Sequence, residues 1–192
     1  MLTGVLLDAE DGAVRLAATD RYRLAVSTVD DASVEGAAAS VLLPVALVDE
    51  VLAAGGTGPA TVRVDGDDVA VETGGGTVRG RRVDAEFPDY RRVLRTDSPH
   101  RLDVDAATLR AELVAAPTRV VPTGPDGVEE TATVLTLGDV EIGVNREFLL
   151  EALDVEGAGQ LVLELDGPLA PLALRDPSRP GDVSMLMPIR LP

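Results

Sequence analysis

The stretch Glu86–Leu94, EFPDYRRVL, gathers side chains suited to binding another molecule. It contains one of the two Phe and one of the two Tyr of the whole chain, next to a Pro and two Arg. A guanidinium group donates several hydrogen bonds to carbonyls or carboxylates, and aromatic rings supply apolar contact area. The sequence thus raises the question of what this stretch contacts. The simplest answer is a solvated arginine stripe that balances nearby acids, since the same region holds Arg79, Arg81, Arg82, Arg91, Arg92, Arg95 and Arg101.

The residues that most catalysis needs are missing from useful positions. His100 is the only His and lies in the loop-like segment DSPHR, and the chain has no Cys. A Ser-His or His-metal constellation therefore cannot be assembled. The acidic clusters at 30–31 and 65–68 lack the spacing of a calcium loop, and GTGP and TGGGT lack the Lys of a phosphate loop. We expect no enzyme activity, no catalytic residue, no metal and no cofactor.

The composition predicts a protein that neither binds nucleic acid unaided nor enters a membrane. Seventeen basic residues, all Arg, stand against 33 acidic ones in 192 residues, which gives a net charge of −16. Phosphate affinity comes from cations, so this balance disfavours direct DNA binding. No apolar run is long enough to cross a bilayer, and the N-terminus lacks the basic region of a signal peptide. With no Cys, a cytoplasmic location is expected.

Hydrophobic patterns predict hairpins and three helices. Asp-Gly pairs at 11–12, 65–66 and 166–167 adjoin segments of alternating apolar residues, which is the pattern of β-hairpins. Helical periodicity predicts helices near residues 44–54, 105–116 and 145–153.

These elements repeat along the chain. A shift of 101 positions places Leu47-Val48 on Phe148-Leu149, Leu52 on Leu153 and Asp65-Gly66 on Asp166-Gly167. Each half then contains a strand, a helix, a hairpin and a closing strand that ends in Pro and Arg. We therefore expect two similar domains with mostly antiparallel sheets.

The two halves differ at their starts. The first half opens on a hairpin with no helix before it, so an upstream domain or a partner is expected to cover its sheet. In the second half, the segment Pro117–Glu129 is rich in Pro, Gly and acid and is expected to be a loop where a full hairpin belongs. These differences predict a fragment of a longer protein or a shortened paralogue.

Four segments resemble the bacterial sliding clamp, the β subunit of DNA polymerase III. They are LTGVLLDAEDGAVRLAATDRYRLAV (2–26), EFPDYRRVL (86–94), VEIGVNREFLLEAL (140–153) and MLMPIRL (185–191), in the order of that family. The similarity covers the second and third domains of the family and lacks the first domain. The resemblance implies an α+β DNA-clamp fold with helices on one face. It also implies a central domain at 1–95 without its first helix and a shortened C-terminal domain at 96–192.

The resemblance also implies a function. In that family, a hydrophobic pocket between these two domains binds short linear peptides of polymerases and repair proteins. The matching positions of this chain are Leu2, Thr19, Arg21, Tyr22, Arg23, Leu24, Pro88, Arg92, Val93, Asn145, Phe148, Met185, Met187, Pro188, Ile189, Arg190 and Leu191. The alternative is that Met185, Met187 and Leu191 alternate along a strand and are ordinary core residues. Asp84, Glu86, Asp89 and Tyr90 are expected to be structural.

The chain departs from the family where clamps face DNA. The inner helices of clamps carry basic residues, whereas the three predicted helices of this chain sum to charges of −2, −1 and −1. We expect weak or absent DNA binding and a weakened processivity role. The alternative function is a clamp-derived regulatory module, such as the C-terminal part of a MerR-type transcription regulator. The upstream coding sequence would separate the two, because a helix-turn-helix there favours the regulator.

Overall fold

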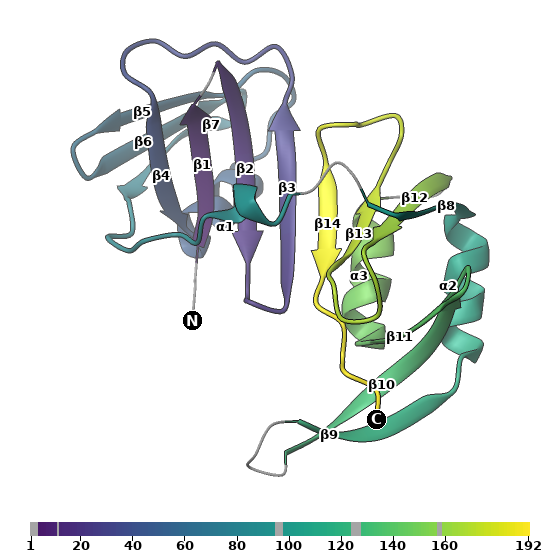
Figure 1. Cartoon of the computed structure of the whole chain (residues 1–192). Helices are drawn as coiled ribbons and strands as arrows, with labels where there is room; N and C mark the ends of the chain where they lie inside the picture. The colour runs from purple at the N-terminus through teal and green to yellow at the C-terminus, as the bar shows by residue number, and fades with distance from the viewer. Residues whose placement is uncertain (1–3, 11, 95–97, 124–127, 157–158) are drawn as a thin grey trace. The chain divides into compact units, whose positions relative to one another are not determined.

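The chain folds into two compact units (Figure 1). The computed structural model describes residues 4–10, 12–94, 98–123, 128–156 and 159–192. Unit 1 comprises Met1–Asp20 and Ser27–Arg91, and unit 2 comprises Arg21–Val26 and Arg92–Pro192. The expected boundary between residues 95 and 96 lies outside the described residues, so the division into domains 1–95 and 96–192 stays a prediction.

Unit 1 consists of two antiparallel sheets and one α-helix. Strand β1 pairs with β2 on one side and with β4 on the other, and β6 pairs with both β5 and β7. The elements are β1 (Gly4–Glu10), β2 (Ala13–Thr19), β4 (Ala39–Pro44), α1 (Val45–Ala54), β5 (Thr61–Asp65), β6 (Asp68–Thr73) and β7 (Gly76–Arg81). Strand β3 (Arg23–Val29) and the 3₁₀ helix η1 (Tyr90–Arg92) each contain residues of both units.

The core of unit 1 lies between α1 and the two sheets. Leu47 of α1 is buried in one cluster with Val41 and Leu43 of β4 and with Val69 and Val71 of β6. Strand β7 approaches α1 closely, because a Cβ on Gly80 would lie 3.1 Å from the Leu47 side chain. The aliphatic residues alternate along their strands, so each sheet turns one apolar face to the helix.

Unit 2 also contains two antiparallel sheets, together with two helices. The N-terminal part of β3 pairs with β14, which continues through β13 and β12 to β8, and β10 pairs with β9 and β11. The elements are β8 (His100–Asp105), α2 (Ala106–Ala115), β9 (Thr118–Thr123), β10 (Val128–Leu137), β11 (Val140–Val144), α3 (Arg146–Glu156), β12 (Gln160–Leu165), β13 (Leu172–Arg175) and β14 (Val183–Leu186).

Helices α2 and α3 pack together over the core of unit 2. Leu109 and Leu113 of α2 and Leu149 and Leu153 of α3 are all at most 2% exposed, in one cluster with Leu163 and Leu174 of the sheet. Both helices begin at side-chain caps. Asp105 Oδ1 accepts a hydrogen bond from the Thr108 amide at 2.8 Å, and Asn145 Oδ1 accepts one from the Phe148 amide at 3.1 Å.

The helices follow the 101-residue repeat but differ in what covers them. Helix α1 begins at Val45 and α3 begins 101 positions later at Arg146. Leu153 is 2% exposed because α2 packs against α3, whereas its repeat partner Leu52 is 73% exposed. In the described part of unit 1, α1 is the only α-helix. The exposed apolar side chain Leu52 thus lies on α1, whereas the sequence argument expected the sheet of the first half to be uncovered.

The expectation of a loop at Pro117–Glu129 was wrong. Strand β9 begins at Thr118, and β10 begins at Val128 and pairs with it. The β-branched run around Val120-Val121 forms the strand, and Pro122 is tolerated because β9 lies at the edge of its three-stranded sheet. The second half thus has the hairpin that the sequence argument found missing.

The predicted α+β class with mostly antiparallel sheets is confirmed. Every strand pair described above is antiparallel, and the helix bounds lie within three residues of the predicted ones. Over the described ranges, no helix is both long enough and apolar enough to cross a membrane.

Candidate functional site

The pairing of β3 with β14 brings two distant predicted segments together in unit 2. Leu24 lies opposite Met185, and Arg23 lies opposite Leu186. Beyond the end of β14, the Met187 amide donates a hydrogen bond of 2.7 Å to the carbonyl of Tyr22. Backbone pairing therefore fixes the segment at residues 22–24 beside the segment at residues 185–187.

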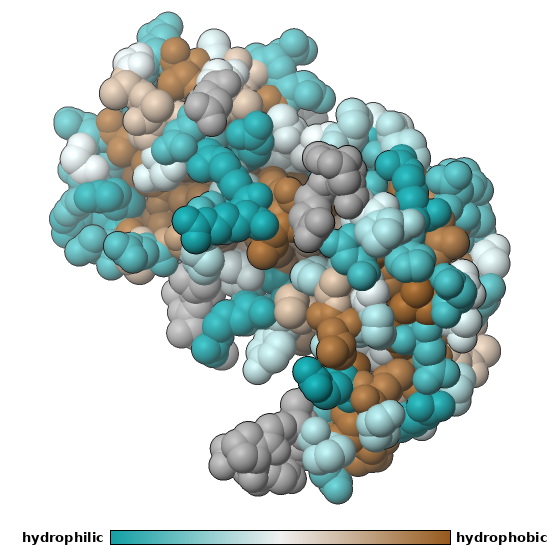
Figure 2. Space-filling view, viewed as in Figure 1, coloured by the Kyte–Doolittle hydropathy of each residue, from teal (hydrophilic) through white to brown (hydrophobic). Residues whose placement is uncertain are grey.

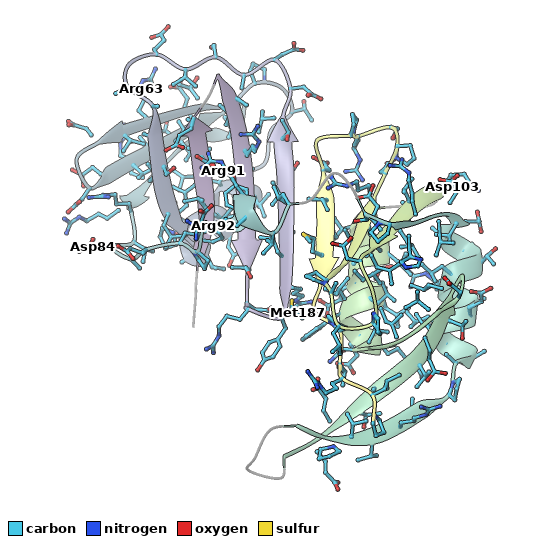
Figure 3. The ribbon with its side chains drawn as sticks, viewed as in Figure 1. Arg63, Asp84, Arg91, Arg92, Asp103 and Met187 are labelled. Carbon is cyan, nitrogen blue, oxygen red and sulfur yellow. The ribbon has the colours of Figure 1, made fainter. Side chains whose placement is uncertain are left out.

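The two segments bury one pair of side chains and expose another. Leu24 and Met185 are each 8% exposed, whereas Tyr22 is 59% and Met187 is 46% exposed. Figure 3 shows Met187 just past the end of β14, and Figure 2 shows apolar patches among the hydrophilic side chains of the surface. Met185 is thus part of the core, as the alternative interpretation held, whereas Met187 is exposed.

Arg23 joins this pair of segments to helix α3. Its guanidinium carbon lies 4.3 Å from the centroid of the Phe148 ring, which is cation–π geometry. Its Nη1 forms an ion pair with Glu151 Oε2, one turn further along α3. The Asn145 cap fixes the start of the helix and hence the place of Phe148. We call Tyr22, Arg23, Phe148 and Met187 the candidate surface.

The C-terminal segment is fixed to β11 by a close backbone approach. The Ile189 amide donates to the Gly143 carbonyl at 2.8 Å, and a Cβ on Gly143 would lie 2.6 Å from the Ile189 oxygen. Ile189 is buried with Val121 and Ala132, and Leu191 packs against this cluster. Glycine is required at this position because any side chain would push the segment away.

The remaining predicted residues have different surroundings. Arg21 has a φ of 81°, a left-handed backbone that costs a non-glycine residue about 1 kcal/mol. Pro188 and Arg190 flank Ile189, and the exposed Arg92 and Val93 follow Tyr90 in the chain. Thr19, at the end of β2, and the exposed Pro88 belong to unit 1. Leu2 lies outside the described residues.

The sequence argument missed Asp8, which anchors the EFPDYRRVL stretch in unit 1. Its carboxylate is fully buried and accepts hydrogen bonds from Ser40 Oγ at 2.9 Å, from Arg91 Nη2 at 2.5 Å and from the Tyr90 hydroxyl. Arg91 also reaches Glu10 at 3.1 Å, and Figure 3 shows Arg91 beside β1. An acid directly after the apolar residues Val5, Leu6 and Leu7 was the available signal for a buried partner.

Tyr90 is the centre of this anchor. It is 4% exposed, and the Phe87 ring meets it edge-on with centroids 6.2 Å apart. Burial, reinforced by the hydrogen bond to Asp8, raises the pKa of the Tyr90 hydroxyl to about 12. The expectation that Tyr90 is structural agrees with this environment.

A pocket in unit 1 opens beside the same anchor. It is lined by apolar groups such as Leu6, Leu42 and Phe87 together with Asp8 and Arg91. Both oxygens of Asp8 already accept hydrogen bonds from protein groups. Among the described residues, no group of three or more His, Asp or Glu side chains could hold a metal ion. The arrangement is thus suited to holding chain segments together.

Comparison with protein families gives a match over residues 1–89. The matching model is described as the central domain of the DNA polymerase III beta subunit. The matched region contains β1 to β7 and the Pro88 side of the EFPDYRRVL stretch.

Comparison with individual proteins extends the similarity to the rest of the chain. The β sliding clamp of Salmonella typhimurium is 25% identical over 215 residues, covering 99% of this chain and 58% of the relative. The DNA polymerase III β subunit of Thermotoga maritima has a TM-score of 0.79 at 26% identity, covering 100% of this chain and 58% of that one. A Pseudomonas aeruginosa sliding clamp bound to griselimycin has a TM-score of 0.79 at 25% identity, covering 98% of this chain and 57% of that one. The chain thus spans somewhat more than half the length of these relatives.

Proposed function

We propose that this chain binds short linear peptides of polymerase or repair proteins. The chain belongs to the family of the bacterial DNA polymerase III β subunit, the sliding clamp. The setting is DNA replication or repair in the cytoplasm, and the proposed role is recognition without catalysis. The candidate surface in unit 2 is one part of the proposed binding site. The other residues of the groove expected from the sequence remain part of this proposal.

The observation that carries the proposal is the exposure of Tyr22 and Met187 on two hydrogen-bonded backbone segments. Two large apolar side chains with 59% and 46% exposure come from backbone segments that are hydrogen-bonded to each other, next to the buried pair Leu24 and Met185. A fixed apolar surface can take an aliphatic or aromatic anchor without first being ordered, which lowers the entropic cost of binding. The flexible Met side chain suits anchors of several shapes.

The chemistry around this apolar pair suits a peptide. Arg23 and Arg190 can donate hydrogen bonds to peptide carbonyls, since a guanidinium group carries five N–H donors. Binding energy in such sites comes mostly from a few buried anchors, so affinity should depend on the apolar floor more than on the net charge of −16. One short motif is expected to bind with a Kd on the order of 1 µM, about −8 kcal/mol. The griselimycin complex of the Pseudomonas aeruginosa relative supports ligand binding by a clamp of this fold.

The test is titration of a labelled clamp-binding peptide against the purified chain. The variant Met187→Asp places a charge among apolar groups and should abolish saturable binding. Leu169→Asp is the matched control, because Leu169 is an exposed apolar residue of the same unit, at 50% exposure, in the turn between β12 and β13. Equal binding by the wild type and by Met187→Asp would refute the proposal, as would an absence of saturable binding.

A truncation of Arg175, another residue of unit 2, would not serve as a second control. Its Nε donates a hydrogen bond of 2.9 Å to Glu164, which is 4% exposed and is also held by Arg101 at 3.0 Å. Removing Arg175 would leave a buried carboxylate with one partner fewer, so the variant would change stability.

A second part of the proposal concerns the open surface of α1. Leu52 occupies the repeat position of Leu153, which α2 covers in unit 2. An upstream domain or a partner that covers Leu52 would complete unit 1 in the same way. Protection of the α1 amides from hydrogen exchange should therefore increase when the chain is produced with its upstream coding sequence, and unchanged exchange would contradict this part.

A further inference from the structure

We propose that Glu151 is a specificity-determining residue of the candidate surface, which by pairing with Arg23 makes the surface prefer peptides that are uncharged next to their apolar anchors. This inference rests on the proposed function. Glu151 is not among the residues that the family resemblance assigns to the groove. The contacts of Arg23 single it out.

Two groups of α3 hold the guanidinium of Arg23. The Phe148 ring lies against one of its faces at 4.3 Å from the guanidinium carbon, and the Glu151 carboxylate pairs with Nη1. Phe148 and Glu151 are three positions apart on the helix and so share one side of it. Arg23 belongs to β3, so this contact joins the strand segment at Tyr22 to the helix within unit 2.

The pairing changes what Arg23 offers to a ligand. An unpaired guanidinium group beside an apolar slot attracts a carboxylate strongly, because the two form charge-assisted hydrogen bonds. Here the charge of Arg23 is already balanced by Glu151. A peptide carboxylate arriving at Arg23 must therefore displace Glu151 or lie beside it, and the second arrangement places two negative charges together. A neutral amide or a backbone carbonyl meets no such repulsion.

The ion pair is accessible, so the effect on binding is moderate and measurable. The Arg23 side chain is 38% exposed and the Glu151 side chain is 62% exposed. Exposed ion pairs correspond to changes of about two- to fivefold in an equilibrium constant. Neutralising Glu151 should therefore raise the affinity for an acidic peptide by that factor. The affinity for a neutral peptide should stay almost the same.

The experiment compares two labelled peptides that differ in one residue. Each carries a Leu and a Phe as apolar anchors, and the residue just before them is Asn in one peptide and Asp in the other. The wild type should bind the Asn peptide more tightly. In Glu151→Gln, the preference for Asn over Asp should fall about two- to fivefold through tighter binding of the Asp peptide. High salt should reduce this difference, since screening weakens exposed charge pairs.

Three further variants separate this effect from alternatives. Glu112→Gln makes the same charge change at an exposed position of α2 in the same unit and should keep the wild-type preference. Glu151→Asp keeps the charge and should also keep it. An unchanged preference in Glu151→Gln, or an equal change in Glu112→Gln, overturns the inference while leaving the proposed function intact. If neither peptide binds the wild type and Met187→Asp behaves identically, the proposed function itself fails, and the inference fails with it.

Discussion

The hydroxyl of Tyr90 donates a hydrogen bond to Oδ2 of Asp8 across 82 positions of the chain, and both residues are buried. The carboxylate also accepts from Ser40 and from Arg91, so β1, β4 and the EFPDYRRVL stretch meet at one group. The contacts with Asp8 thus give some of the aromatic and arginine side chains in that stretch a structural role. Its first Arg and its Tyr hold the segment to unit 1, while Arg92 and Val93 continue into unit 2.

Tyr90→Phe should therefore destabilise the chain. The substitution removes one donor from a buried carboxylate and keeps the ring, so the free energy of unfolding should fall by about 1–2 kcal/mol. Tyr22→Phe is the matched control, since Tyr22 is 59% exposed and its hydroxyl loss should change stability by less than about 0.5 kcal/mol. Urea unfolding of the three proteins measures both values. Equal stability of the two variants would mean that the Asp8 contact contributes nothing.

The same hydrogen bond predicts a dependence of stability on alkaline pH. The pKa of Tyr90 is raised from 10.0 to about 12 in the folded chain, chiefly by burial. Because the folded state favours the protonated phenol, its contribution is complete below pH 10 and is lost as the pH rises toward 12. The stability difference between the wild type and Tyr90→Phe should thus be constant from pH 7 to 9 and then narrow. A difference that stays constant up to pH 12 would contradict the raised pKa.

Leu52 and Leu153 occupy equivalent positions of the repeat, yet truncating each to Ala should change stability by very different amounts. Leu153→Ala leaves a cavity under α2 and should cost about 2–5 kcal/mol. Leu52→Ala removes a side chain that is 73% exposed and should change the stability of this chain by less than about 0.5 kcal/mol. Thermal or urea unfolding of the two variants tests this. A large cost at Leu52 would mean that α1 is already covered in the purified protein.

The sequence predicted the helices and hairpins well because their patterns are local. The 101-residue repeat placed α1 and α3 correctly, and Asp65-Gly66 marked the turn between β5 and β6. Strand β9 was missed because Pro122 and the Gly and acid residues after it dominated the window, while its partner β10 decides the conformation. The contacts of Asp8 and Glu151 were not predicted, for a related reason. Their partners Tyr90 and Arg23 lie 82 and 128 positions away, and no local pattern links them.

The close backbone approach at Gly143 holds the C-terminal segment to β11, and we expect peptide binding to depend on this attachment. Gly143→Ala would place a Cβ 2.6 Å from the Ile189 carbonyl oxygen, so the segment must shift, at a cost of about 1–3 kcal/mol. The Ile189 amide, bonded to Gly143 in the wild type, should then exchange faster with deuterium, and peptide affinity should fall. Gly74→Ala is the control, because its added Cβ meets ordinary contacts of 3.5 Å or more. Slow exchange of the Ile189 amide in Gly143→Ala would refute this attachment.

The last prediction concerns DNA, which the helices of this chain are poorly equipped to hold. Helix α1 carries Asp49 and Glu50 with no Arg, and α3 carries one Arg against four acids. The Arg residues of α2 and α3 are already engaged, since Arg110 pairs with Asp154 and Arg146 donates to the Ala116 carbonyl at 2.9 Å. Phosphates gain affinity only from cations that become available to them.

The 192-residue chain should therefore not be retained on a nicked circular plasmid at about 0.15 M salt, where screening leaves only close contacts effective. Gel filtration of the mixture measures co-elution with the plasmid. The double variant Glu112→Lys and Glu147→Lys adds cations to α2 and α3 and should introduce a binding that weakens steeply with salt, by about one logarithmic unit of slope for each phosphate contacted. Retention of the wild type on the circle, released by cutting the plasmid, would show that the chain encircles duplex DNA despite these acidic helices.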